Sequence, residues 1–312
     1  MTTRRRLSLG PPAAAVLALL LLVLLSPGTP AQGAARAAAA TENELATREA
    51  LAQMRAGGNA VDAAITAALV AGVASPSSSG IGGGGFALVW VAADKKVTTL
   101  DFRESAPAAV DAAALEKRPL PPAERGKLTG VPGEVAGLFE LHRRHGKRAW
   151  KDVVEPAVRV AKNGYPVNPH LASTLASAEK DLRVDSGLGA LFFPAGKPAA
   201  VGGLIKNEKL GATLAKIAAE GAPGFYQGAT AADLIAAARA HGGALTQADL
   251  DAYKPAERSA VKLSWEGHDV YTMPPPSAGG LMLAQTLRLF SKAELAKHRW
   301  NTGAYQHVLA EG

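Results

Sequence analysis

The sequence predicts a mixed α/β fold of the α+β kind, in which helices predominate. Alanine-rich segments with apolar residues at three- and four-residue spacing alternate with only a few short runs of β-type residues. Capping residues, glycines and prolines mark the ends of most of these segments. No internal repeat, low-complexity tract or interdomain linker divides residues 34–312, a length that suits one large domain or two small ones.

Residues 1–33 are predicted to be a cleavable signal peptide. Arg4, Arg5 and Arg6 precede a thirteen-residue apolar run from Ala13 to Leu25, and small residues follow it. The run is shorter than the about 20 apolar residues that cross a bilayer. We therefore expect export to the periplasm or the extracellular space without a stable membrane anchor. The chain has no cysteine, which excludes a lipoprotein anchor and disulfide bonds.

The charge of the chain gives no indication of a nucleic-acid partner. Three of the 34 Lys and Arg residues and none of the 27 Asp and Glu residues lie in the predicted leader, so the net charge falls from +7 to +4 without it. No basic run remains, and aromatic residues make up only 5% of the sequence. Nucleic-acid binding needs a concentrated basic face or a stacking platform, and the sequence has neither.

The first elements lead to a run of four glycines. A helix over residues 44–56 should end at Gly57 and Gly58, and Asn59 should cap the next helix through its side-chain oxygen. That helix has apolar residues at four-residue spacing and ends before Pro76. Residues 82–85 are all glycine, which suits a backbone that bends freely or lies close to a neighbouring segment.

A hairpin is predicted directly after the glycines. Residues 86–92 and 97–102 have the composition of strands, and residues 93–96 should form the turn. This arrangement places Phe86 within a residue or two of Arg103 across the hairpin. A guanidinium beside exposed backbone N–H groups is suited to binding a carboxylate.

The rest of the chain is predicted to be mostly helical. Residues 106–127 contain four prolines and should be irregular. Helices are expected after Gly133, from Trp150 to Asn163 with a restart at Pro156, and after the cap Asn168. The later elements are a helix with Leu210, Leu214 and Ile217 on one face, an alanine-rich helix around Leu234, a capping box at Thr246–Asp249, a hairpin of residues 261–265 and 269–273, a helix with Leu283, Leu287 and Phe290 on one face, and a helix over residues 302–311.

Several kinds of catalytic or binding site are disfavoured. Residues 80–85 match G-x-G-x-x-G, but the predicted order of helix, loop and strand is the reverse of that in a dinucleotide site. His142 and His145 have suggestive spacing, yet no third ligand lies at a metalloprotease spacing, so a packed and a solvated histidine are favoured over a metal site. The G-x-S-x-G motif of a serine hydrolase does not occur. We therefore expect no cofactor and no metal.

Three motifs in order resemble the N-terminal part of the γ-glutamyltransferase (γ-glutamyl transpeptidase) family of N-terminal nucleophile hydrolases. They are GGNAVDAA at 57–64, SGIGGGGF at 79–86 and DFRESAP at 101–107. Later matches are Val131-Pro132-Gly133, His145-Gly146-Lys147, Pro156-Ala157, 164–167 (GYPV) and 274–280, where Ala278 stands in place of the second serine usual in the family. The resemblance implies a four-layer αββα sandwich, of which residues 34–312 would form the helix-rich part belonging to the large subunit.

The resemblance also implies a role for Arg103, which in similar enzymes holds the α-carboxylate of the γ-glutamyl substrate. Its planar fork suits a carboxylate better than a lysine would. Asp101, Glu104 and the glycines Gly82, Gly83 and Gly84 are expected to position it. The alternative for Arg103, judged from position alone, is a surface arginine paired with Glu104, Asp101 or Asp111.

The catalytic nucleophile of the resembling family is a threonine freed by self-cleavage, in a Thr-Thr-His/Ser motif that this chain does not contain. We therefore expect residues 34–312 to be truncated before the self-cleavage site, to need a small subunit, and to be inactive alone, with no catalytic residue of their own. The implied activity is hydrolysis or transfer of γ-glutamyl groups from glutathione-type substrates to water or amino acids. Two alternatives stay open: a relative with a changed substrate, such as a glutaryl-cephalosporin-type acylase, and a non-catalytic orphan large subunit.

Overall fold

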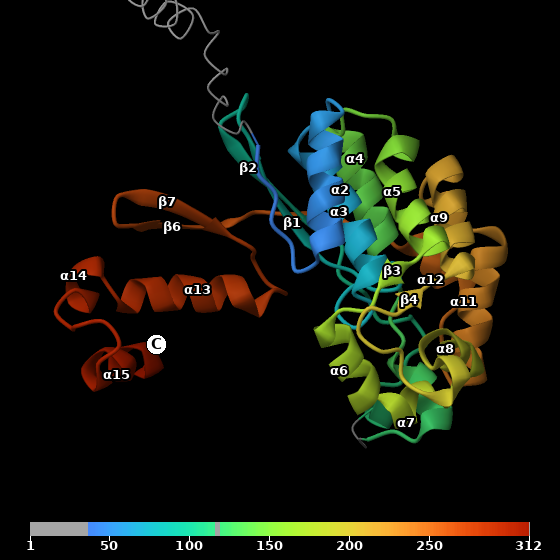
Figure 1. The fold of residues 1–312 in the computed structure, drawn as a ribbon. Helices are drawn as coiled ribbons and strands as arrows, with labels where there is room; N and C mark the ends of the chain where they lie inside the picture. Colours follow the sequence, from blue (N-terminus) through green and yellow to red (C-terminus); the bar gives the residue numbers. More distant parts are fainter. Residues whose placement is uncertain (1–36, 116–118, 312) are drawn as a thin grey trace, which may run out of the picture. The chain divides into compact units, whose positions relative to one another are not determined.

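The computed structural model describes residues 37–115 and 119–311, and the described residues from Ala39 onward form one compact unit. Within that unit the fold is α+β and helix-rich, as predicted (Figure 1). The predicted signal peptide, residues 1–33, lies outside the described residues. None of the described helices is both long and apolar enough to cross a membrane.

The glycine run follows two helices that begin with asparagine caps. Helix α2 (Glu44–Arg55) begins after Asn43, and α3 (Ala60–Ala74) begins after Asn59. Asn59 Oδ1 accepts hydrogen bonds from the backbone N–H groups of Val61 and Asp62, and the Asp62 carboxylate accepts one from the N–H of Asn59. This reciprocal capping box satisfies donors that a helix start otherwise leaves unpaired.

Helix α5 (Trp150–Asn163) continues through Pro156, so the predicted restart at this proline is wrong. Proline cannot donate a hydrogen bond to the carbonyl four residues earlier, which here belongs to Asp152. The side-chain amide of Gln53 donates to that carbonyl at 2.6 Å, and the hydroxyl of Thr66 donates to the carbonyl of Val153 at 2.7 Å. Side chains from α2 and α3 thus satisfy the carbonyls around the proline, which keeps the helix continuous.

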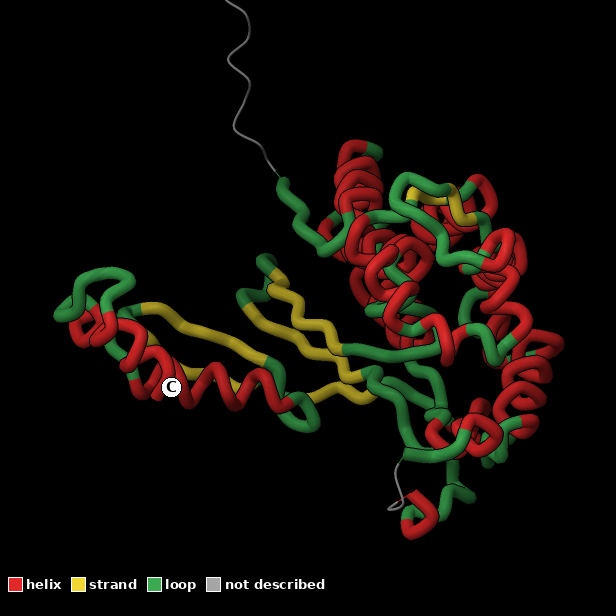
Figure 2. The backbone as a smooth tube through the Cα atoms, turned by 60° about the horizontal axis from the view of Figure 1, so that its bottom comes forward, coloured by secondary structure: helices red, strands yellow, loops and turns green. Residues whose placement is uncertain are grey.

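The sheet that carries the glycine run has three antiparallel strands in the order β1-β2-β5. Strands β1 (Phe86–Val91) and β2 (Lys96–Asp101) form the predicted hairpin, and β5 (Ala256–Arg258) pairs with the other edge of β2. Phe86 lies opposite Asp101, two residues from the predicted partner Arg103 and within the predicted tolerance. Figure 2 shows the strands in yellow and the helices, which predominate, in red.

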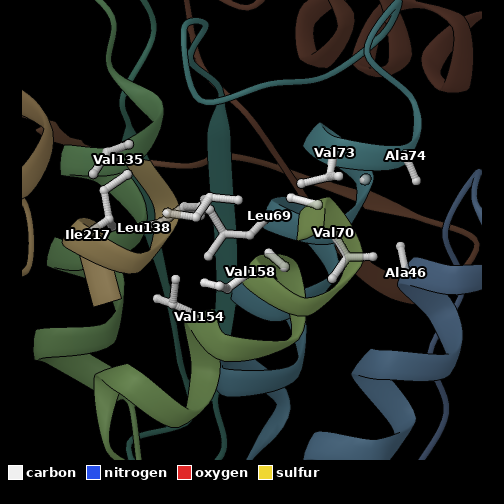
Figure 3. Packing of buried hydrophobic residues seen from close by; sticks show 14 of the residues in the cluster. Ala46, Leu69, Val70, Val73, Ala74, Val135, Leu138, Val154, Val158 and Ile217 are labelled. Carbon is white, nitrogen blue, oxygen red and sulfur yellow. The ribbon is translucent and has the colours of Figure 1, made fainter. Parts of the chain in front are cut away.

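The hydrophobic core lies among α2, α3, α5, α4 (Glu134–His145) and α9 (Glu208–Glu220). Figure 3 shows side chains from all five helices meeting in this cluster, for example Ala46, Leu69, Leu138, Val154 and Ile217. Leu100 and Phe102 of the hairpin are also buried in it. The core therefore fixes the position of β2 and of the residues that follow it.

The remaining elements connect these helices or follow them. They are η1 (Ala113–Leu115), η2 (Pro122–Leu128), β3 (Tyr165–Pro166), α6 (Pro169–Ser177), α7 (Glu179–Leu182), α8 (Ser186–Phe192), η3 (Pro194–Gly196), β4 (Leu204–Ile205), α10 (Pro223–Tyr226), α11 (Gly228–Ala240), α12 (Gln247–Ala252), β6 (Val261–Trp265), β7 (His268–Thr272), α13 (Ala278–Leu289), α14 (Lys292–Leu295) and α15 (Gly303–Glu311). Thr246 and Asp249 form the predicted capping box at α12.

Helix α13 packs against the β6–β7 hairpin through small residues. Its buried residues are Gly280 and Ala284, whereas Leu283 is 44% exposed. A Cβ on Gly280 would run into the carbonyl oxygen of Met273, so a glycine is needed for the close approach. Apolar spacing alone cannot tell which stripe of a helix contacts its neighbour when small residues make the contact.

Candidate functional site

The glycine loop is held between the end of β2 and the start of α4. Gly85 and Phe102 exchange backbone hydrogen bonds of 3.3 and 2.9 Å, which extends the hairpin by one pair. The carbonyl of Gly83 accepts hydrogen bonds from the N–H groups of Gly133 and Glu134, at 2.8 and 2.9 Å. A helix start supplies such unpaired donors. The loop is therefore clamped on both sides.

Close backbone approach explains why position 84 is glycine. A Cβ there would press on the carbonyl oxygen of Phe102 and lie 3.0 Å from both the Arg103 Cα and the Glu104 N. All three are backbone atoms, which cannot turn aside as a flexible side chain can. The predicted neighbourhood of the glycines and Arg103 is thus confirmed.

The backbone of Arg103 is fixed from two sides. Its N–H donates to Oδ1 of Asp101 at 3.0 Å, and its carbonyl accepts from the hydroxyl of Tyr253 at 2.9 Å. Asp101 is itself buried, and its Oδ2 accepts from Nε of Arg258 at 2.6 Å. The chain around Arg103 is therefore positioned by β2, β5 and the residue that follows α12.

The side chain of Arg103 is exposed, and within the described residues its guanidinium takes part in no hydrogen bond or ion pair. The alternative of an arginine paired with a neighbouring carboxylate is not what the described residues show, because Asp101 pairs with Arg258 instead. The five donors of the guanidinium are available to a ligand.

Arg103 lines a cavity of about 530 Å³ together with Gly82 and Glu104. Lys127 and Thr129 line its other side, and Lys127 donates to the carboxylate of Glu124 at 2.6 Å. A cavity with a free guanidinium and an ammonium group on its wall is suited to a small anion-bearing ligand.

Of the six predicted site residues, the structure places Arg103, Glu104 and Gly82 on the cavity wall. Asp101, Gly83 and Gly84 lie behind it, where Asp101 and Gly83 take part in the backbone hydrogen bonds described above. The supporting residues Tyr253 and Arg258 were not predicted. They lie about 150 residues along the chain from the residues that they hold, and nothing in their local sequence indicates that contact.

Burial perturbs the acid groups behind the loop. Glu134 is only 8% exposed, and this burial, together with the charge of Glu104, raises the pKa of its carboxyl to about 7. Burial likewise raises the pKa of the Tyr253 hydroxyl, with smaller contributions from Asp101, Glu104 and Glu134. The Tyr253 hydroxyl therefore stays protonated and able to donate to the carbonyl of Arg103.

In the described part of the chain, His142 and the glycine loop have other structural settings than a metal or dinucleotide site would give them. Nε2 of His142 lies 2.8 Å from the carbonyl oxygen of Arg148, and His142 packs edge-on against Trp150. Among the described residues no three His, Cys, Asp or Glu side chains gather as a metal site would require. The glycine loop follows helix α3 and precedes strand β1, which is the reverse of the order in a dinucleotide site.

Comparisons with known proteins agree with this fold. The gamma-glutamyltranspeptidase family model matches residues 46–312. Glutathione hydrolase 2 of Arabidopsis thaliana is 36% identical over 239 residues, which cover 77% of this chain and 41% of that protein. The chain spans less than half the length of this and other curated relatives that it matches.

Two solved structures show the same fold. The gamma-glutamyltranspeptidase of Helicobacter pylori has a TM-score of 0.82 at 31% identity, covering 88% of this chain and 80% of that one. The cephalosporin acylase of Bacillus halodurans has a TM-score of 0.73 at 30% identity, covering 85% and 50%. The fold is that of the N-terminal nucleophile hydrolases. The chain belongs to the gamma-glutamyltranspeptidase family and corresponds to its N-terminal, large-subunit part.

Proposed function

We propose that this chain is the large-subunit part of an enzyme that hydrolyses or transfers γ-glutamyl groups from glutathione-type substrates. Family membership and the name glutathione hydrolase carried by the curated relatives support this activity. The observation that carries the proposal is the Arg103 guanidinium, which lines the cavity and is unpaired within the described residues.

In this proposal Arg103 binds the α-carboxylate of the γ-glutamyl group through a bidentate pair of hydrogen bonds. Asp101 sets the backbone of Arg103 by accepting its N–H, and the Asp101–Arg258 pair keeps Asp101 in place. The glycines let the loop pass close to the Arg103 backbone, and Glu104 forms a second polar wall of the cavity. None of these residues forms or breaks a bond with substrate.

The nucleophile belongs, in this proposal, to a second segment that a small subunit supplies. The relatives are more than twice as long as the part of them that this chain matches, which leaves room for such a segment. The chain of residues 1–312 is then inactive by itself. Its leader, residues 1–33, would direct it out of the cytoplasm, and Edman sequencing of the exported protein would locate the cleavage point.

A second candidate is an acylase that takes glutaryl rather than γ-glutamyl groups. The structural similarity to a cephalosporin acylase favours it. Both substrates offer a carboxylate to Arg103, so the two candidates differ in whether an α-amino group is recognised. A non-catalytic large subunit, which binds ligand but has no companion, is the third.

Three anilides separate these candidates. Binding of γ-glutamyl-, glutaryl- and 4-aminobutyryl-p-nitroanilide to the purified chain is measured by isothermal titration calorimetry, and release of p-nitroaniline is followed by absorbance. We expect the γ-glutamyl compound to bind most tightly, the 4-aminobutyryl compound, which lacks the α-carboxylate, to bind about tenfold or more weakly, and no compound to be cleaved. Tighter binding of the glutaryl compound would favour the acylase, and turnover by this chain would overturn the assignment of the nucleophile to a second segment.

A further inference from the structure

A second cavity, of about 570 Å³, opens between helices α9 and α11. Its base is apolar and includes the buried ring of Phe225 and the half-buried side chains of Leu210 and Leu234. Small residues of the two helices, among them Ala212 and Ala237, complete the walls. A mostly apolar cavity of this size, with a few polar groups around it, suits a small molecule.

Gly82 joins this cavity to the one that Arg103 lines, because it belongs to the walls of both. It is exposed, and a Cβ on it would meet nothing within 4 Å, so the loop is bare backbone beside open space at this point. Gly84, two residues along the loop, lies against the backbone of Arg103. Two residues span at most about 7 Å. A ligand held by Arg103 therefore needs to cross only a short piece of the loop to enter the second cavity.

Three charged side chains lie at the rim of the second cavity. Lys209 and Lys216 belong to α9 and Asp233 to α11, and all three are exposed. Within the described residues, no ion pair or hydrogen bond uses either ammonium group or the Asp233 carboxylate. The lysines are seven residues apart on one helix, about 10 Å along its axis, so a single carboxylate can contact only one of them. Repulsion from Asp233 would direct that carboxylate toward α9.

The cavity is therefore suited to an apolar group that carries a carboxylate. The amine half of a γ-glutamyl amino acid has this form, because the amino acid is linked through its nitrogen and keeps its side chain and its carboxylate free. The compound is two residues long, on the order of 7 Å when extended, which is enough to cross the loop at Gly82. The same position serves hydrolysis and transfer, since the leaving amine and the incoming amine flank the same γ-glutamyl carbonyl.

We propose that the cavity between α9 and α11 binds the amine half of the γ-glutamyl compound and selects apolar amino acids with a free carboxylate. The apolar base receives the side chain, and Lys209 or Lys216 pairs with the carboxylate. The inference rests on the proposed function, because it takes the γ-glutamyl half to be bound by Arg103. It adds the chemical class of the leaving or accepting amine.

Three compounds test the cavity by isothermal titration calorimetry on the purified chain: γ-glutamyl-leucine, γ-glutamyl-glycine and γ-glutamyl-leucinamide. All three keep the group that Arg103 binds. We expect γ-glutamyl-leucine to bind at least about tenfold more tightly than the glycine compound, because its side chain leaves water. It should bind about twofold to fivefold more tightly than the amide, as an ion pair near the surface allows.

Replacement of the lysines shows which ammonium group binds the carboxylate. Lys209→Gln or Lys216→Gln, one of the two alone, should remove the preference for γ-glutamyl-leucine over its amide, and the double variant should remove it in any case. Lys206→Gln is the matched control, because Lys206 is an exposed lysine just before α9 and outside the cavity lining. It should keep the preference.

Filling the cavity gives a second readout. Ala237→Phe places a ring in the cavity and should lower the affinity for γ-glutamyl-leucine to that for γ-glutamyl-glycine or below. Binding of the glycine compound should persist, which shows that the variant is folded. Ala236→Phe is the matched control, because Ala236 is the neighbouring exposed residue of α11 and does not line the cavity. It should leave all three affinities unchanged.

Equal binding of the leucine and glycine compounds would overturn the proposal, and so would a leucine preference that survives Ala237→Phe. A preference over the amide that survives in the double lysine variant would also overturn it. Self-association in sedimentation that Ala237→Phe removes, without any preference for leucine, would show a second copy in the cavity instead.

A fourth compound, 4-aminobutyryl-leucine, separates this inference from the proposed function, because it lacks only the α-carboxylate. If the cavity plays no part, γ-glutamyl-leucine still binds more tightly than this compound. If Arg103 does not bind the α-carboxylate, the two bind alike, while the effects of the leucine side chain and of the lysines remain.

Discussion

Replacement of Gly84 by alanine tests whether the glycine loop must approach the backbone of Arg103 closely. The added Cβ would press on the Phe102 carbonyl oxygen and lie 3.0 Å from the Arg103 Cα. Neither atom can move without shifting the backbone between β2 and α4. Overpacking of this kind costs about 1–3 kcal/mol, so Gly84→Ala should lower the free energy of unfolding by that amount.

Gly82→Ala is the matched control, because it lies two residues away in the same loop. A Cβ there meets nothing within 4 Å. Its φ is outside the left-handed region, so alanine adds no strain, and the free energy of unfolding should stay the same or rise by up to about 1 kcal/mol through a less flexible unfolded chain. Urea unfolding followed by circular dichroism measures both variants.

The Gly84→Ala substitution should also displace Arg103. A shift of about 1 Å in a binding group is enough to weaken a well-oriented contact markedly. Binding of γ-glutamyl-p-nitroanilide to folded Gly84→Ala should therefore weaken. If Gly84→Ala is as stable as Gly82→Ala, the close approach does not constrain the loop and this explanation of the glycine run is wrong.

Three further predictions concern the groups around the site. Asp101→Asn removes the charge that pairs with Arg258 and should cost about 1–3 kcal/mol in urea unfolding, whereas Asp269→Asn, at an ion pair with both side chains 51% exposed, should cost less than about 1 kcal/mol. Equal losses would contradict the role given to the buried carboxylate. Asn59→Ala removes the cap of α3 and should lower the melting temperature by an amount equivalent to about 0.5–2 kcal/mol, which differential scanning calorimetry would detect; an unchanged value would contradict the capping role. Because the folded pKa of Glu134, about 7, is above its unfolded value, the folded state binds the extra proton between pH 4.5 and 7, and stability should fall as pH rises through that window, by on the order of 3 kcal/mol. Glu134→Gln should remove this part of the pH dependence, and identical pH profiles of the two proteins would refute it.

Local signals in the sequence predicted the local structure well. Asn59, Asn168 and the Thr246–Asp249 box all cap helices where the sequence places them. These caps depend on atoms within three residues of one another, so the sequence contains all that they need. The register of the hairpin was predicted from its turn only to within two residues, since Phe86 lies opposite Asp101 rather than Arg103.

The errors and omissions have tertiary causes. Pro156 does not interrupt α5 because Gln53 and Thr66, far away in sequence, donate to the carbonyls around it. Tyr253 and Arg258 support the Arg103 segment from about 150 residues away. Neither set of long-range contacts can be predicted from local composition or spacing.

The candidate site was likewise predictable only in part. The resemblance to known motifs pointed to Arg103 and the glycines, and the structure then placed them together. That the guanidinium is unpaired within the described residues could not be predicted, because Asp101 is close in sequence and its pairing with the distant Arg258 leaves no local signal.

The central claim is that the Arg103 guanidinium binds the α-carboxylate, and a cycle of protein and ligand changes tests it most directly. Dissociation constants are measured by calorimetry for wild type and Arg103→Gln, each with γ-glutamyl- and 4-aminobutyryl-p-nitroanilide. If the contact exists, Arg103→Gln weakens the γ-glutamyl compound by about tenfold to a hundredfold and leaves the 4-aminobutyryl compound unaffected. Arg103→Lys should recover part of the affinity, because it restores the charge without the planar fork. Equal effects of Arg103→Gln on both anilides, or no effect on either, would show that the carboxylate is bound elsewhere.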